Sequence, residues 1–178
     1  MTPTRLFAVR HAPTEAEGIC YGQTEVPLTH SHADAAGEMR EALSGVSVDG
    51  VWASDLPRCR EPASLLAASL EVPLRVTEAL RELSMGEWEG RAWDDLERED
   101  HARVHRWMSA WQTEAPPGGE TLPAFESRVR RWHAELSNEP SVVVAHAGVV
   151  RCLEVIRRGR PWSDAMALPV PHLALVRL

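Results

Sequence analysis

Lysine is absent from this chain of 178 residues, whose 19 basic side chains are all arginine. The absence excludes chemistry that needs a lysine amine, such as a Walker A phosphate site, a kinase-type lysine or a Schiff base. Any bound anion must therefore be held by arginine, histidine, backbone N–H groups or a metal. The formal charge of −7 also argues against nucleic acid or an anionic membrane as a partner, because both select a basic surface. The base composition of the gene is the simplest explanation for arginine in place of lysine.

Cysteine is scarce and long apolar runs are missing. Cys20, Cys59 and Cys152 are odd in number and widely spaced, which fits neither a disulfide framework nor a zinc site. No apolar run approaches the roughly 20 residues of a membrane span, and the first residues lack the pattern of a signal peptide. With a length that suits one domain, these features predict a cytoplasmic protein with a single domain over residues 1–178. We expect a monomer or a homodimer.

Short apolar segments alternate with helical patterns along the chain. Candidate strands, rich in β-branched residues, lie at 6–9, 51–53, 74–76, 142–145 and 173–176. Helical periodicity covers 29–43, 122–136 and 148–158. Thr121 is the expected N-cap of the second helix, and Pro123 fits its first turn. The alternation predicts an α/β fold with three layers, α/β/α, around a mainly parallel central sheet.

Basic side chains follow three of the predicted strands, at the point where each strand ends. Arg10 and His11 follow the first strand, Arg58 comes shortly after the second, and His146 follows the strand at 142–145. Because the carboxyl ends of parallel strands meet at one edge of a sheet, these four side chains can converge there. The sequence therefore predicts an anion site.

Phosphate is the anion that such a site suits best. Arginine holds phosphate oxygens through two parallel hydrogen bonds and does not lose its charge. One cationic histidine would offset further phosphate charge, while the other, as neutral imidazole, can act as a nucleophile. Because phosphomonoester hydrolysis is among the slowest uncatalysed reactions, a covalent phosphohistidine is an attractive intermediate. A carboxylic acid would then protonate the leaving alkoxide.

Five segments carry short motifs in a fixed order, at residues 10–14, 54–58, 80–90, 117–120 and 145–148. They read RHAPT, SDLPR, LRELSMGEWEG, PGGE and AHAG. The set resembles the R-H-G-x-T, S-x-L-x-R, L-x-E…F-G-x-W-E-G, P-G-G-E and S-H-G-G motifs of the histidine phosphatase superfamily, which includes phosphoglycerate mutase. Because the motifs follow the family order over most of the chain, the chain is identified as a member of this family.

The resemblance implies a phosphoglycerate mutase-like fold and a role for each matching residue. His11 would be the nucleophile that becomes phosphohistidine, and Arg10, Arg58 and His146 would bind the phosphoryl group. Glu82 would act as general acid toward the leaving group and then as the base that activates water. The resemblance implies neither a metal nor any other cofactor, and its expected partner is a small phosphomonoester.

Several residues depart from the family pattern. Ala12 and Ala147 stand where the family usually has glycine, and Ala147 is a candidate for substrate contact. Glu61 and Pro62 replace a usual Gln-Thr pair, and Pro62 would kink or restart the helix after the second strand. All five proposed catalytic positions keep the residue that the family pattern has there.

Residues 18–29 resemble the α-ribazole phosphatase branch of the family, which acts in cobalamin assembly. The resemblance places Gly22, Gln23 and Thr24 on the substrate side, whereas the alternative is a simple turn before the next helix. We therefore expect hydrolysis of a small phosphorylated metabolite, with α-ribazole 5′-phosphate as the specific candidate. A broad-specificity phosphatase and a phosphoglycerate mutase are the alternatives among enzymes.

A non-catalytic phospho-ligand-binding protein on the same fold is the alternative from another class. Such a protein would be expected to lose the nucleophile or the acid, and both His11 and Glu82 are present.

Tryptophan is abundant relative to the other aromatic residues, with seven Trp against two Phe and one Tyr. Trp88, Trp93, Trp107 and Trp111 cluster in a segment that the resemblance places across the mouth of the pocket. Core packing is the expectation for most of them, and contact with an apolar or aromatic leaving group for at most one.

His101 and His105 stand four residues apart, a spacing that could bind a metal on one helix face. No glutamate between them completes an H-E-x-x-H arrangement. A solvated polar face is therefore the simpler interpretation.

Overall fold

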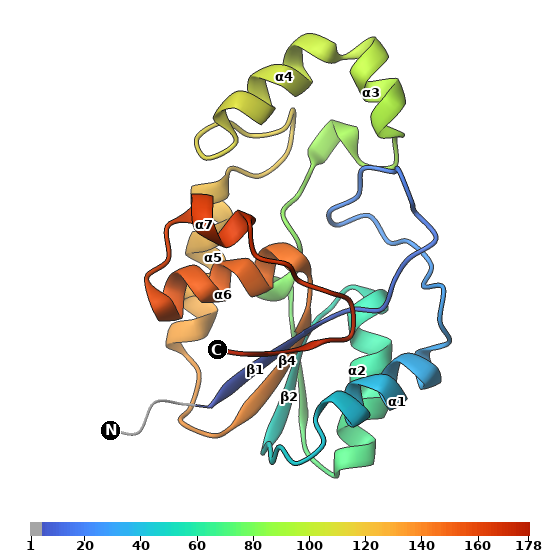
Figure 1. Cartoon of the computed structure of the whole chain (residues 1–178), viewed down its shortest axis with the longest axis vertical. Helices are drawn as coiled ribbons and strands as arrows, with labels where there is room; N and C mark the ends of the chain where they lie inside the picture. Colours follow the sequence, from blue (N-terminus) through green and yellow to red (C-terminus); the bar gives the residue numbers. More distant parts are fainter. Residues whose placement is uncertain (1–4) are drawn as a thin grey trace.

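The computed structural model describes residues 5–178, which form a five-stranded sheet with helices on both faces (Figure 1). The strands are β1 (Leu6–Arg10), β2 (Gly50–Ser54), β3 (Leu74–Thr77), β4 (Ser141–Ala145) and β5 (Leu175–Arg177). Their order is β3-β2-β4-β1-β5, and β5 pairs antiparallel with β1 whereas the other pairs are parallel. The predicted α/β fold with a mainly parallel sheet is confirmed.

Two pairs of helices cover the sheet. One face carries α1 (His32–Ala42) and α2 (Pro57–Leu70), and the other carries α5 (Leu122–Ala134) and α6 (Ala147–Arg158), against which the short α7 (Trp162–Met166) packs (Figure 1). Within residues 5–178, no helix combines the length and the apolar character that crossing a membrane requires.

The segment between β3 and α5 begins against the sheet and then extends away from it, to the top of the view in Figure 1. It contains the 3-10 turns η1 (Glu78–Leu80) and η2 (Gly86–Trp88) and the helices α3 (Trp93–Glu99) and α4 (His101–Ala110). We call residues 78–111 the cap segment. It has a small apolar cluster of its own, centred on Trp88 and Leu96.

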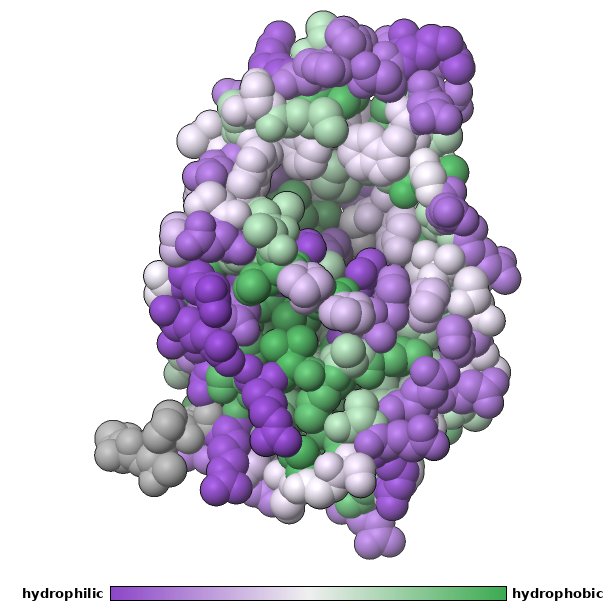
Figure 2. All heavy atoms as spheres, in the orientation of Figure 1, coloured by the Kyte–Doolittle hydropathy of each residue, from purple (hydrophilic) through white to green (hydrophobic). Residues whose placement is uncertain are grey.

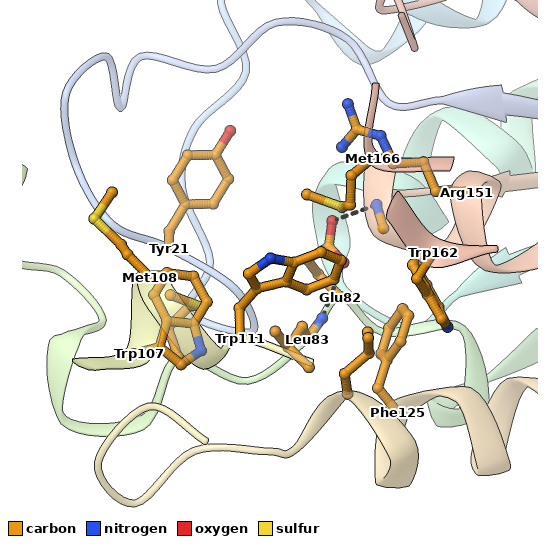
Figure 3. A pocket seen from close by; sticks show the side chains of 13 residues that line it. Tyr21, Glu82, Leu83, Trp107, Met108, Trp111, Phe125, Arg151, Trp162 and Met166 are labelled. Carbon is orange, nitrogen blue, oxygen red and sulfur yellow. Dashed lines mark hydrogen bonds between the residues drawn. The ribbon is translucent and has the colours of Figure 1, made fainter. Parts of the chain in front are cut away.

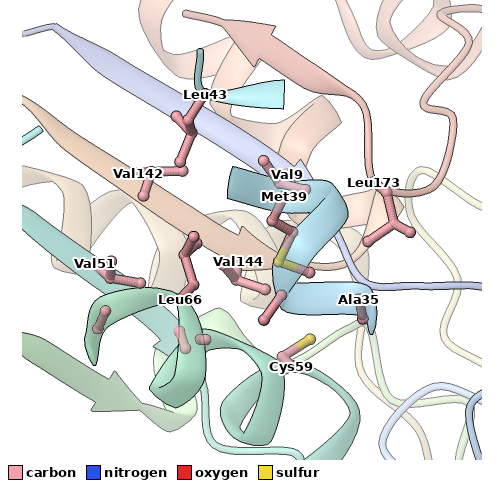
Figure 4. Close-up of a cluster of buried hydrophobic side chains, with 14 of the residues drawn as sticks. Val9, Ala35, Met39, Leu43, Val51, Cys59, Leu66, Val142, Val144 and Leu173 are labelled. Carbon is pink, nitrogen blue, oxygen red and sulfur yellow. The ribbon is translucent and has the colours of Figure 1, made fainter. Parts of the chain in front are cut away.

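Alternate residues of β4 supply both halves of the core. Val142 and Val144 face α1 and α2, whereas Val143 and Ala145 face α5 and α6, as the period of two in a strand requires. The first half also contains Val9, Met39, Val51, Leu66 and Leu173 (Figure 4). Because burying each such side chain stabilises the fold by about 1.5–3 kcal/mol, the carboxyl ends of β1, β2 and β4 are rigidly placed.

Three predicted boundaries are wrong by two or three residues, and one of them is the end of the helix predicted over 122–136, which stops at Ala134. The helix predicted from residue 29 begins at His32, because the side chain of Ser31 caps it by accepting a hydrogen bond from the backbone N–H of Asp34. The last strand was predicted from residue 173 but begins at Leu175. Leu173 has a φ of +60°, a left-handed conformation that a strand does not allow.

The predictions for Pro123 and Pro62 have different outcomes. Thr121 caps α5, its side chain accepting a hydrogen bond from Ala124, and Pro123 lies in the first turn, so both predictions are confirmed. The predicted restart at Pro62 does not occur, because α2 runs from Pro57 to Leu70 with Pro62 buried inside it.

Candidate active site

The carboxyl ends of β1, β2 and β4 meet around a cavity of about 470 Å³, which we call the basic cavity. His11 and His146 both line it, and their rings make an edge contact with centroids 5.2 Å apart. His11, Arg58 and His146 are each at most 2% exposed. The structure thus brings together the five predicted catalytic residues and one of the predicted substrate contacts, namely Arg10, His11, Arg58, Glu82, His146 and Ala147.

His11 is held in a single orientation and a single tautomer. Its backbone N–H donates to the carbonyl of Ala145 on β4 (2.9 Å), and its ring Nδ1 lies 2.7 Å from the carbonyl oxygen of Ala12. Since a carbonyl only accepts, Nδ1 carries the hydrogen and Nε2 keeps its lone pair. Burial lowers the pKa of His11 to about 3. The bond to Ala12 opposes this shift, whereas the positive charge of the nearby Arg58 adds to it. His11 is therefore a neutral imidazole suited to nucleophilic attack.

A third histidine, His172, contacts both the backbone and the ring of His11. The Nδ1 atom of His172 lies 2.7 Å from the carbonyl oxygen of His11, and the two rings have centroids 5.3 Å apart. The same segment binds Arg10, whose Nη1 donates to the carbonyl of Val170 (3.1 Å). His172 was not predicted, because an isolated histidine near the end of the chain belongs to none of the five motifs.

Arg58, which follows the end of β2, is oriented by the loop after β1. Its Nη1 donates to the carbonyl of Thr24 (2.9 Å) and to the carboxylate of Glu25 (3.1 Å), and its Nη2 donates to the carbonyl of Gly22. Glu25 also accepts the backbone N–H of Arg58 (2.9 Å) and was not predicted. It is the only carboxylate paired with this guanidinium among residues 5–178.

Three arginines that line the basic cavity have a buried donor without a partner. Within residues 5–178, the Nε atoms of Arg10, Arg58 and Arg151 are buried and make no hydrogen bond. Buried donors without partners are rare in folded proteins, and an oxyanion in the cavity supplies acceptors. This observation fits the predicted phosphate site.

Gly22, Gln23 and Thr24 bind other parts of the protein. The side-chain amide of Gln23 donates to the backbone carbonyl of Glu82 (3.2 Å), and a Cβ atom on Gly22 would lie only 2.0 Å from the carbonyl oxygen of Leu83. Of the described residues that line the basic cavity, none comes from this trio. Their contact with substrate stays a prediction, and the structure gives them the task of positioning the loop.

The carboxylate of Glu82 is fixed by two backbone amides. Its Oε1 accepts from Leu83 (2.9 Å) and its Oε2 from Gly148 (3.0 Å), the second residue of α6 (Figure 3). A Cβ atom at position 148 would lie 2.1 Å from Glu82 Oε1, so a larger residue there would displace the Glu82 carboxylate from this position. Arg128 on α5 donates to the backbone carbonyl of Glu82 (2.9 Å) and pairs with Glu120 of the PGGE motif (2.8 Å). Arg128 was not predicted.

His146 lies against β2, where its Nε2 is 3.1 Å from the hydroxyl of Ser54 and 3.6 Å from the thiol of Cys59. Burial lowers its pKa well below the usual value, and the nearby His11 and Arg58 add to this effect. The protein alone therefore holds His146 neutral, whereas the sequence predicts a cation. A phosphoryl dianion beside the ring would raise the pKa and favour the cation.

A second cavity, of about 480 Å³, adjoins the basic cavity (Figure 3). The surface is hollowed below the cap segment, with hydrophobic residues inside the hollow (Figure 2). We call this the aromatic cavity because of its lining residues, which include Leu83, Trp107, Met108, Trp111, Leu122, Phe125, Trp162 and Met166. Tyr21, Glu82, Met85 and Arg151 line both cavities.

The tryptophans of the cap segment have different environments. Trp88 is fully buried and packs edge-on against Trp107, with centroids 5.7 Å apart, which confirms core packing for this residue. Trp93 lines the basic cavity, whereas Trp107 and Trp111 line the aromatic cavity. The prediction that at most one tryptophan contacts the leaving group is not tested by this arrangement.

His101 and His105 lie on the outside of the cap segment and are exposed, which confirms the polar face. Both rings approach the same oxygen of Glu97, at 2.7 and 2.9 Å, and these bonds lower the pKa of that carboxylate. Glu97 precedes the pair by four residues and was not considered in the sequence analysis.

The chain is similar to proteins of one family over nearly its whole length. A family model described as "Histidine phosphatase superfamily (branch 1)" matches residues 6–178. The adenosylcobalamin/alpha-ribazole phosphatase of Escherichia coli (strain K12) is 34% identical over 168 residues, which cover 91% of this chain and 82% of that protein. The crystal structure of the alpha-ribazole phosphatase from Shigella flexneri has a TM-score of 0.86 at 31% identity, covering 96% of this chain and 88% of that one. A mycobacterial glucosyl-3-phosphoglycerate phosphatase, 24% identical with a TM-score of 0.83, shares the fold and covers 98% of this chain and 90% of that one.

Proposed function

Because the chain belongs to the histidine phosphatase superfamily, we propose that it hydrolyses a phosphomonoester through a phosphohistidine at His11. The observation that carries this proposal is the state of that residue: neutral, buried, and with Nδ1 occupied by the carbonyl of Ala12. His11 lines a cavity whose three arginines, Arg10, Arg58 and Arg151, have unpartnered Nε donors among the described residues. A nucleophile and an oxyanion site therefore lie side by side.

In the first step, Nε2 of His11 attacks phosphorus while the bond from phosphorus to the leaving oxygen breaks. Glu82 gives a proton to that oxygen, so the product leaves as an alcohol. Arg10, Arg58 and His146 bind the phosphoryl oxygens and offset the charge that spreads over them. The phosphoryl group is then attached to His11, and Glu82 is a carboxylate.

In the second step, the Glu82 carboxylate takes a proton from a water molecule as its oxygen attacks the phosphohistidine. The bond between phosphorus and Nε2 breaks, inorganic phosphate leaves, and His11 returns to neutral imidazole. The protein residues supply every proton transfer in both steps, so we propose that the reaction needs no metal.

The substrate we propose is α-ribazole 5′-phosphate, hydrolysed in cobalamin biosynthesis. The Escherichia coli and Shigella flexneri relatives, described as alpha-ribazole phosphatases, support this choice. We further propose a cytoplasmic enzyme built as one domain, and the three free cysteines support that compartment, because disulfides are rare where thiols are kept reduced. Monomer or homodimer stays a prediction.

A turnover screen tests the function. Release of inorganic phosphate is followed with α-ribazole 5′-phosphate, 3-phosphoglycerate and sugar phosphates, with and without EDTA. We expect the first substrate to be preferred and EDTA to change nothing. Equal turnover of all substrates would favour a broad-specificity phosphatase, and phosphate transfer within 3-phosphoglycerate would favour a mutase.

A trapping experiment tests the intermediate. Rapid quenching with a ³²P-labelled substrate should leave label on the protein that is stable in base and lost in acid, as phosphohistidine is. Phosphate binding without turnover or label would contradict the proposal and favour the non-catalytic binder. Loss of activity on chelation, restored by a metal, would contradict the metal-independent mechanism.

A further inference from the structure

We infer that the aromatic cavity binds a flat, apolar aromatic base carried by the leaving alcohol, and that its tryptophans determine substrate specificity. The inference rests on the proposed function, since it takes the phosphoryl group to be bound at His11. Glu82 lines both cavities, so a substrate that spans them places its scissile bond beside the proposed acid.

The side chains around the aromatic cavity suit a flat ring. Trp107 and Trp111 come from α4 and the turn after it, and Phe125 and Trp162 come from α5 and α7 (Figure 3). Indole and phenyl faces stack on planar aromatic ligands, and the thioether of Met108 adds a polarisable contact. These side chains enclose the hollow from opposite sides.

Beyond its border, the aromatic cavity offers no cation to a second anionic group. Of the described residues that line it, only Glu82 and Arg151 are charged, and both lie at its border with the basic cavity. A small acid such as glycerate would leave the apolar walls in contact with water. A purine would bury ring nitrogens and an amino group that these walls do not pair, whereas an alkylated benzimidazole lacks most of those groups.

The aromatic cavity has room for a ligand larger than a single sugar. Its volume of about 480 Å³ lies within the roughly 300–1,000 Å³ of sites that bind drug-sized molecules. A ribose at the border and a bicyclic base beyond it account for such a space.

The border between the two cavities carries the polar groups that a sugar needs. Tyr21 lines both cavities, and its hydroxyl bonds to the hydroxyl of Thr14 (2.9 Å). Arg151 on α6 lines both as well; its Nη2 donates to the carbonyl of Leu168 (3.2 Å), while its buried Nε has no partner among residues 5–178. Sugar hydroxyls placed between the phosphate and the base would bond to Arg151.

Exposed apolar side chains mark the mouth of the aromatic cavity. Met108 and Met166 are 56% and 44% exposed, and they make up two of the four large hydrophobic side chains exposed on residues 5–178. Both line this cavity. Exposed apolar surface at the rim of a pocket is typical of a ligand site, whereas isolated exposed residues elsewhere need no explanation.

The test compares two substrates that differ only in the base. For the unmodified enzyme, we expect kcat/KM for α-ribazole 5′-phosphate to exceed that for ribose 5-phosphate by 100-fold or more. Trp111→Ala should reduce this ratio at least tenfold, and Trp111→Phe, which keeps a flat ring, should restore most of it. The matched control is Leu65→Ala, an exposed apolar side chain on α2 outside both cavities, which should leave the ratio unchanged.

Binding gives a second readout that does not depend on turnover. Calorimetry with α-ribazole, which lacks the phosphate, should show binding to the unmodified enzyme and at least tenfold weaker binding to Trp111→Ala. A thermal melt shows whether each variant is folded before its data are used.

The outcomes separate this inference from the proposed function. Equal kcat/KM for the two substrates, or adenosine monophosphate hydrolysed as fast as α-ribazole 5′-phosphate, would overturn the inference and leave the phosphatase intact. An unchanged ratio in a folded Trp111→Ala variant would do the same. Absence of both turnover and phosphohistidine would overturn the proposed function instead.

Discussion

The two cavities that share Glu82 are built in different ways. In the basic cavity, Arg10 ends β1, His11 and His146 directly follow β1 and β4, and Arg58 lies at the start of α2. The side chains of His11, Arg58 and His146 are almost fully buried. The aromatic cavity is formed by side chains of the cap segment, α5, α6, α7 and the turns between them, and it opens through partly exposed methionines. The positions of the residues at the strand ends of the basic cavity follow from the register of the sheet, in which Arg10 pairs with Ala145. The shape of the aromatic cavity depends on how side chains of separate helices and loops pack together.

This difference separates reaction from selectivity. Any phosphomonoester presents the same group to the basic cavity, so changes there should affect all substrates alike. Only the leaving group reaches the aromatic cavity, so changes there should alter the ranking of substrates. The following predictions test whether the two cavities are independent in this sense.

The largest effect is expected for His11→Ala. Removal of the nucleophile should lower kcat by about 10⁴-fold or more, the scale seen when an enzyme loses its nucleophile. The loss should be the same for α-ribazole 5′-phosphate, ribose 5-phosphate and 4-nitrophenyl phosphate, measured as phosphate release. The Leu65→Ala variant serves as the control. Activity that survives nearly intact would disprove the assignment of His11.

Glu82→Gln should have the next largest effect, and this effect should depend on the leaving group. An alkyl phosphate should lose about 10²–10³-fold in kcat, the range of general acid catalysis. An aryl phosphate should lose less, because an aryl oxide leaves without full protonation. Steady-state kinetics with ribose 5-phosphate and 4-nitrophenyl phosphate make the comparison. Equal losses on both substrates would count against Glu82 as the acid.

Glu25→Gln should have a moderate effect that is uniform across substrates. Glu25 contacts Arg58 through both carboxylate oxygens, so it is a positioning residue for the phosphoryl group. We expect KM and the inhibition constant of inorganic phosphate to rise about tenfold, a change of about 1.4 kcal/mol, with a smaller change in kcat. Glu25→Asp should recover part of the loss. A change in the ranking of substrates would contradict this role.

The last prediction concerns the pH dependence of stability and not the rate of the reaction. Folded His11 stays neutral down to a pH of about 3, where its pKa lies, whereas the unfolded histidine binds a proton below about pH 6.5. The free energy of unfolding therefore falls as pH drops through this window, by at most about 1.4 kcal/mol per pH unit for this histidine. Denaturant unfolding should show a shallower pH dependence for His11→Asn. Trp111→Ala, which removes no titrating group, should keep the slope of the unmodified protein, and a changed slope there would contradict the separation.

The sequence predicts the basic cavity well because its residues are tied to local patterns. Because Arg10 and His11 follow an apolar strand, the sequence predicts that their side chains lie at the carboxyl edge of the sheet. The same reasoning found Arg58 and His146. Glu82 was predicted only from the resemblance to the family, because it does not directly follow a predicted strand.

The sequence could not predict the residues that act through long-range contacts. Glu25 and His172 touch the site only because loops return to it, and no spacing along the chain records that return. The aromatic cavity combines residues from 21 to 166, so its shape depends on how the helices pack. The start of β5 was misplaced because leucine gives no signal for the left-handed backbone of Leu173.

The position of Glu82 between the two cavities sets an order of events. In the reaction we propose, the water that Glu82 activates must approach phosphorus from the side on which the alcohol departed, since His11 occupies the opposite side. That path runs through the space that the alcohol has just left. An alcohol that lingers there excludes water and can take the phosphoryl group back, so exit of the first product controls whether the cycle ends in hydrolysis or in reversal.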